Sequence, residues 1–146
     1  MSGHKNIEGE YHEEEYIDIT VTEPQTLRDG EKEYTTYKIT TETTFPEYNQ
    51  RLFSVRRRYS QFVTLHAILK KKLNGNPKNI KFGALPSLPG DTMSSLFSSK
   101  GRFEPDFIEK RRAALEEWLN VVAHHSFLRF ESALHSFLQD EEWPKK

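Results

Sequence analysis

Arginine and tyrosine side chains that could bind a phosphate meet where a predicted strand is followed by a predicted helix. In the run VRRRYSQF, alternation along the strand puts Arg56 and Arg58 on one face, directly before Tyr59. An arginine can hold a phosphate through two parallel hydrogen bonds, and the first turn of a helix adds free backbone N–H donors. Tyr59 could lie flat against a sugar-like ring. The residues alone leave a second interpretation open, in which these arginines form a charged edge strand that deters sheet-to-sheet pairing.

A further candidate cation lies on the inward face of a helix predicted to begin near Pro105. The buried stripe of this helix consists of Phe107, Ile108, Arg111, Leu115, Trp118, Leu119 and Val122. Arg111 belongs to the stripe, whereas Arg112 is rotated about 100° away from it. An arginine on a buried stripe needs a partner. That partner is either a ligand or an acidic side chain of the same fold.

The Ser-rich loop that precedes this helix carries a small apolar cluster that could touch a membrane. Met93, Leu96 and Phe97 have the spacing of one helical turn, and the basic residues Lys100 and Arg102 follow them. An apolar wedge beside cations is typical of segments that enter the headgroup region of anionic lipid. The alternative is that the three side chains pack onto the core beneath the loop.

Three predicted strands and three predicted helices must position these residues. The strands cover residues 16–21, about 34–44 and 51–59, and their short links indicate an antiparallel meander. The Asp-Gly pair at Gly30 signals a turn, but its polar flanks predict a loose connection instead of a two-residue hairpin. Helical spacing predicts a first helix capped by Ser60, a second from Pro105 and a last one opening at Ser126.

This order of elements predicts an α+β fold, in which a three-stranded antiparallel sheet packs against a helical subdomain with a long proline-containing loop. We expect one folded domain over residues 15–142, a disordered acidic tail over 1–14 and a C-terminal tail over 143–146. The chain of 146 residues is 12% aromatic, which is enough large apolar surface for one core.

Composition excludes several classes of function. There is no cysteine, and the six histidines show no metal-ligand spacing, so no metal site is expected. Glycine-rich phosphate loops and nucleophile motifs are missing, so we expect no catalytic residue and no cofactor. The aromatic signatures of RNA-binding domains are missing as well, which argues against nucleic acid. No apolar run is long enough for a transmembrane segment, so membrane contact is expected to be peripheral.

Charge is distributed unevenly along the chain although the formal net charge is only −1. Residues 1–33 hold three basic and ten acidic residues, whereas residues 51–112 hold fourteen basic and four acidic ones. The second window therefore carries +10 and contains every candidate named above. An asymmetry of this kind indicates an anionic partner.

Three motifs, in their order and spacing, resemble the phox-homology (PX) domain of the sorting nexins. They are RRRYSQF followed by an amphipathic helix, the Pro-x-x-Pro segment PSLPG, and FIEKRRAALEEWL. The resemblance covers about residues 15–142. It implies a non-catalytic module that binds phosphatidylinositol 3-phosphate and is peripheral on the cytosolic face of early endosomes, where it serves protein sorting. It extends to sorting nexin 3-like single-domain members, which act with retromer as cargo adaptors, and to members that continue into a BAR domain.

The resemblance also implies roles for individual residues. Arg58 would hold the 3-phosphate, Tyr59 would stack on the inositol ring, and Arg111 would bind the hydroxyls at its 4- and 5-positions. Arg57 would face structure or solvent. The segment that carries Met93, Leu96 and Phe97 matches the region of the family's membrane-inserting loop.

Asp91 departs from the family pattern, in which a lysine follows the Pro-x-x-Pro segment and neutralises the 1-phosphate. An acid there would repel a phosphodiester. Either a neighbouring lysine compensates, with Lys81 and Lys100 as candidates, or lipid binding is weaker than in the family. This position also supports the alternative function, a PX-fold protein-interaction module with weak or lost lipid binding.

Overall fold

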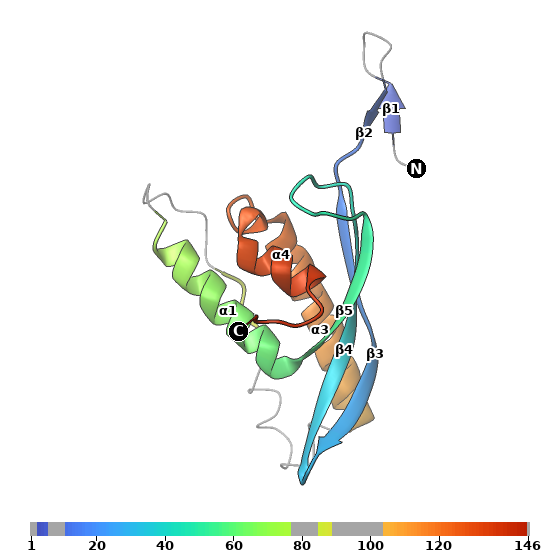
Figure 1. Ribbon diagram of the computed structural model, residues 1–146, viewed down its shortest axis with the longest axis vertical. Coiled ribbons are helices and arrows are strands. Elements are labelled where there is room, and N and C mark those ends of the chain that lie inside the picture. The colour runs from blue at the N-terminus through green and yellow to red at the C-terminus, as the bar shows by residue number, and fades with distance from the viewer. Residues whose placement is uncertain (1–2, 6–10, 77–84, 89–103, 146) are drawn as a thin grey trace.

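A computed structural model describes residues 3–5, 11–76, 85–88 and 104–145 of the chain (Figure 1). The described elements are β1 (Gly3–Lys5), β2 (Tyr11–Glu13), β3 (Ile17–Asp29), β4 (Lys32–Thr43), β5 (Leu52–Arg58), α1 (Tyr59–Asn74), α3 (Pro105–His124), the 3-10 helix η2 (Leu128–Phe130) and α4 (Ser132–Gln139). The predicted α+β class is confirmed, because the strands precede the helices and form a sheet of their own.

Strands β3, β4 and β5 form an antiparallel sheet in that order, with Ile39 paired to Val21 on one side and to Val55 on the other. Alternation puts these residues on the buried face of the sheet, where they meet the apolar sides of the helices. Figure 1 shows the helices gathered on one side of the sheet. Phe62 of α1 and Phe137 of α4 meet edge to face at 5.1 Å in this core.

The turn between β3 and β4 is tighter than the sequence predicted. Asp29 pairs directly with Lys32, so the connection is a two-residue hairpin and the predicted loose link is wrong. Gly30 takes a positive φ of 66° at the first position of the turn, which is the position where type II′ hairpins need glycine. The start of β4 lies near Tyr59 of α1 and Arg111 of α3, with which it shares the lining of one cavity.

The outer edge of β3 is covered by side chains of α3 instead of by another strand. Asn120 accepts a hydrogen bond from the N–H of Ile19 at 3.1 Å and donates one to its carbonyl at 2.8 Å. Toward the helix start, Glu116 accepts from the N–H of Val21 at 2.9 Å, and Arg112 donates to the Val21 carbonyl at 2.7 Å. Spacing by four residues aligns these side chains along the strand. The outward backbone groups of Ile19 and Val21, which could otherwise pair with another chain, are thus satisfied within the fold.

Two helices begin elsewhere than predicted. α1 begins at Tyr59 and not after Ser60, because the Gln61 side chain accepts the N–H of Arg58 at 2.8 Å and thereby caps the helix earlier. The last helix, α4, does not open at Ser126. The ring nitrogen Nδ1 of His125 accepts the N–H groups of Phe127 and Leu128. These bonds favour the short 3-10 helix η2 before α4 begins.

The structure describes short pieces of both predicted terminal segments. Within the predicted acidic tail, Gly3–Lys5 and Tyr11–Glu13 form the antiparallel pair β1 and β2. At the other end, Trp143 is only 6% exposed, although the predicted tail begins there. Its ring packs edge to face on Phe137 at 5.0 Å, and Gln61 donates a hydrogen bond to its carbonyl. The folded unit therefore extends at least as far as Trp143.

Candidate anion-binding pocket

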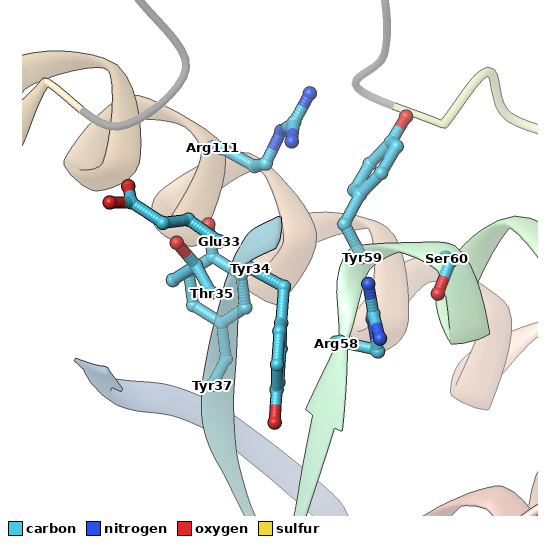
Figure 2. A pocket seen from close by; sticks show the side chains of 8 residues that line it. All are labelled: Glu33, Tyr34, Thr35, Tyr37, Arg58, Tyr59, Ser60 and Arg111. Atoms are coloured by element: carbon cyan, nitrogen blue, oxygen red, sulfur yellow. The ribbon is translucent and has the colours of Figure 1, made fainter. Parts of the chain in front are cut away.

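A pocket of about 190 Å³ lies where β5 ends and α1 begins (Figure 2). The last residue pair between β4 and β5 joins Thr36 to Arg58, so the preceding residues of β4 have no β5 neighbour. The start of α1 and the first half of α3 close the space that remains. The described residues that line it are Glu33, Tyr34, Thr35, Tyr37, Arg58, Tyr59, Ser60 and Arg111. The structure thus brings together Arg58, Tyr59 and Arg111, the three residues for which the resemblance implies contact with the headgroup.

Arg58 occupies the junction between the strand and the helix. Its side chain is exposed, and its guanidinium lies 4.3 Å from the centroid of the Tyr34 ring. The residue is also the N-cap of α1, so its charge lies beside the N-terminal backbone donors of that helix. This combination of a solvent-accessible guanidinium and a helix N-terminus is suited to an anion.

Arg111 lines the pocket from α3 and is largely buried, with 8% of its surface exposed. Its guanidinium lies 3.8 Å from the centroid of the Tyr59 ring and 4.6 Å from that of Phe107. Stacking on two aromatic faces stabilises a cation that is partly removed from water. The neighbouring Arg112 forms a salt bridge on the same helix, where it lies 2.6 Å from a carboxylate oxygen of Glu109.

Tyr37 forms part of the pocket wall and is only 1% exposed. Burial raises the pKa of its hydroxyl to about 12, although the nearby charge of Arg111 lowers it in part. The phenol is therefore neutral near neutral pH and carries a proton that it can donate. Sequence reasoning missed Tyr37, Tyr34 and Glu33. Alternation along β4 outward from the buried Ile39 would have placed residues 37, 35 and 33 on one face.

The other two arginines of the triplet form hydrogen bonds within the fold. Arg57 is 1% exposed and donates to the carbonyls of Phe137 at 3.0 Å, Glu141 at 3.1 Å, and Asp140. Burial lowers its pKa to about 10. On the opposite face of the strand, Arg56 donates to the hydroxyl of Thr36 at 3.1 Å. Of the triplet, only Arg58 lines the pocket.

Seven residues singled out from the sequence lie outside the described part of the chain. They are Lys81, Asp91, Met93, Leu96, Phe97, Lys100 and Arg102. The Pro-x-x-Pro segment is described in part: the indole N–H of Trp118 donates to the carbonyl of Pro86 at 3.0 Å. This bond ties the loop to α3, the helix that carries Arg111.

No group of three or more His, Cys, Asp or Glu side chains among the described residues could hold a metal ion. None of the helices in the same residues combines the length and the apolar character needed to cross a membrane.

Comparison with known proteins finds sorting nexins. The PX domain family model matches residues 45–141. Human sorting nexin-3 is 35% identical over 129 residues, which cover 86% of this chain and 75% of that protein. Sorting nexin-1 of Rattus norvegicus is 34% identical over 138 residues, and these cover 93% of this chain but 26% of that protein. The chain thus spans about a quarter of that relative, and the same share of sorting nexin-4 of Colletotrichum higginsianum, which is 36% identical over 131 residues.

A solved structure gives the same fold. The X-ray structure of a designed CISK-PX domain superposes with a TM-score of 0.63 and covers 84% of this chain and 98% of that chain. Sequence identity in this pair is 23%, so the likeness bears on the fold alone.

Proposed function

Because the chain belongs to the PX domain family, with sorting nexins among its relatives, we propose that it binds phosphatidylinositol 3-phosphate and thereby reaches endosomal membranes. One observation carries the proposal. Arg58, Tyr59 and Arg111, which are 53 positions apart at the extremes, line the same cavity of about 190 Å³. Two guanidinium groups and an aromatic ring around a space of this size suit a phosphorylated sugar-like ring.

In this proposal Arg58 binds the 3-phosphate. Its exposed guanidinium can form two parallel hydrogen bonds to phosphate oxygens, and the N-terminus of α1 adds positive potential at the same place. Tyr34 lies under the guanidinium at 4.3 Å and limits its freedom before the ligand arrives. Less side-chain entropy is then lost on binding.

Arg111 and Tyr59 act on the ring of the headgroup. The Tyr59 ring offers an apolar face to the inositol, and the Arg111 guanidinium stacked on Tyr59 can donate to the ring hydroxyls. Tyr37 forms part of the pocket wall beside them, and its phenol is neutral. Since Arg111 is held by two aromatic rings, its donors are positioned before binding.

Membrane insertion and recruitment complete the proposal. Met93, Leu96 and Phe97 would enter the lipid surface beside Lys100, which adds affinity to that of the headgroup pocket. Lys81 or Lys100 would compensate for Asp91 at the 1-phosphate. The protein would act on the cytosolic face of early endosomes in protein sorting, with retromer or other sorting-complex proteins and their cargo as partners, and without catalysis.

Vesicle co-sedimentation tests the proposal. The protein is mixed with phosphatidylcholine–phosphatidylserine vesicles that either contain phosphatidylinositol 3-phosphate or contain extra phosphatidylserine of equal total charge. We expect sedimentation with the first and much less with the second, because the pocket recognises geometry as well as charge. Equal sedimentation with both would favour the alternative function, a PX-fold protein-interaction module.

A further inference from the structure

An acidic side chain lines the cationic pocket. Among the described residues around this cavity, Glu33 is the only acid, and it shares the space with Arg58 and Arg111. In Figure 2, Glu33, Thr35 and Tyr37 lie along β4, and Arg58 and Tyr59 lie across from them at the start of α1. A carboxylate in a pocket that must hold a phosphate needs an explanation, because it weakens the attraction of the two arginines for any anion.

The β3–β4 hairpin fixes the position of this carboxylate. Glu33 is the register partner of Arg28, and a carboxylate oxygen of Glu33 lies 2.9 Å from the guanidinium. Of the two side chains, Glu33 is 35% exposed and Arg28 is 67% exposed. Glu33 lines the cavity and Arg28 does not belong to its described lining. Glu33 thus presents a carboxylate to the cavity, and its compensating cation lies on the neighbouring strand β3.

The chemistry of a carboxylate distinguishes hydroxyl groups from phosphates. An ionised carboxylate accepts hydrogen bonds from hydroxyls and repels a second anion. Besides its 1-phosphodiester, an inositol ring with a single phosphate on Arg58 carries hydroxyls that it can turn toward β4. A ring with a further phosphate on that side brings like charges together in a partly enclosed space.

We propose that Glu33 restricts the pocket to singly phosphorylated inositol headgroups. The inference rests on the proposed function and names the ligand class that the same pocket accepts. The competing explanation is that Glu33 serves only the hairpin through Arg28. Exposed ion pairs of this type contribute little to stability, and the hairpin is also held by Gly30 and by the Thr26–Thr35 hydroxyl contact at 3.2 Å. Replacement of Glu33 should therefore leave the hairpin folded.

The test compares Glu33→Gln with Glu31→Gln, which changes the net charge equally in the same turn but outside the described lining. Vesicles of phosphatidylcholine and phosphatidylserine carry phosphatidylinositol 3-phosphate, 3,4-bisphosphate or 3,5-bisphosphate. We expect the Glu33 variant to bind at least one bisphosphate about tenfold more tightly than the Glu31 variant, since a repulsive charge pair is removed. Both variants should bind the monophosphate equally.

Equal binding of both bisphosphates by the two variants would overturn the inference. The proposed function fails by a different result, which is that the unaltered protein shows no preference for monophosphate vesicles over charge-matched plain ones. The comparison between variants does not depend on that preference.

A reverse change tests the same idea without altering Glu33. Arg28→Gln removes the compensating cation, so bisphosphate binding should fall several-fold below that of Lys32→Gln, the charge-matched change at the other end of the turn. Equal bisphosphate binding by these two variants would count against the inference.

Discussion

Adjacent arginines in this protein differ in role because a strand turns successive side chains to opposite faces. Arg57 faces inward and satisfies carbonyls of the C-terminal segment, whereas Arg58 reaches the pocket. A buried guanidinium with several carbonyl partners belongs to the architecture, and an exposed one beside a helix N-terminus is available to a ligand. Stability and binding should therefore separate cleanly between these two neighbours.

We predict that Arg57→Met lowers the free energy of unfolding by about 3 kcal/mol, because buried carbonyl groups lose their donor. Arg58→Ala should change it by less than about 1 kcal/mol, since it removes only an exposed contact with Tyr34. Urea unfolding followed by tryptophan fluorescence measures both. A larger loss for Arg58→Ala than for Arg57→Met would reverse the assignment.

At the scale of single residues, strand alternation and helical period predicted which face of an element a side chain lies on. Arg58, Tyr59 and Arg111 fall on the expected faces and meet in the structure. Alternation along β4 puts Glu33 on the face of Tyr37, but whether Glu33 and Tyr34 line the pocket depends on where β5 ends relative to β4. That register is a tertiary property, and no local pattern reports it.

The sheet that forms one side of the pocket is bound along its β3 edge by helix α3. Three side chains of α3 pair with the backbone of β3, so the helix bearing Arg111 and the sheet bearing Arg58 are fixed relative to each other. The geometry of the pocket therefore depends on this contact as well as on the core.

We predict that Asn120→Ala lowers the free energy of unfolding by about 2 kcal/mol, because both the N–H and the carbonyl of Ile19 lose a partner at a part-buried site. Glu117→Ala on the exposed face of α3 is the control and should change it by less than about 0.5 kcal/mol. Equal denaturation midpoints for the two variants would show that the edge contact contributes nothing to stability.

Element bounds followed from the sequence where a single period persisted and failed where it was interrupted. The first strand was predicted only over residues 16–21, but β3 continues to Asp29. The register shifts between Thr22 and Gln25, and Glu23 adopts a positive φ of 49°. A bulge of this kind lets a strand continue past Pro24 while it breaks the alternation by which strands are recognised.

At the scale of the whole molecule, the described cations of the basic window do not all lie at the pocket. Lys70, Lys71 and Lys72 are near the end of α1, and Figure 1 shows this end directed away from the β3–β4 turn. Tyr59 and Lys71 are twelve positions apart, a rise of about 18 Å along the helix, which is more than twice the distance of about 8 Å over which physiological salt screens charge. Composition counts these lysines with Arg58 and Arg111, although they cannot act at the same pocket.

We therefore predict that replacing all three lysines by glutamine changes binding to vesicles with phosphatidylinositol 3-phosphate by less than about threefold at physiological salt. Co-sedimentation of this variant beside the unaltered protein measures the effect. A loss of tenfold or more would mean that the far end of α1 also meets the membrane.

The central claim concerns the pocket alone, and it is tested most directly without a membrane. Calorimetric titration with a short-chain, soluble phosphatidylinositol 3-phosphate compares the unaltered protein with Arg58→Ala. We predict saturable one-to-one binding by the first and a loss of at least about tenfold in affinity for the second, which corresponds to a charge-assisted hydrogen-bonded contact. Equal affinity of the two proteins for the soluble lipid would contradict the account.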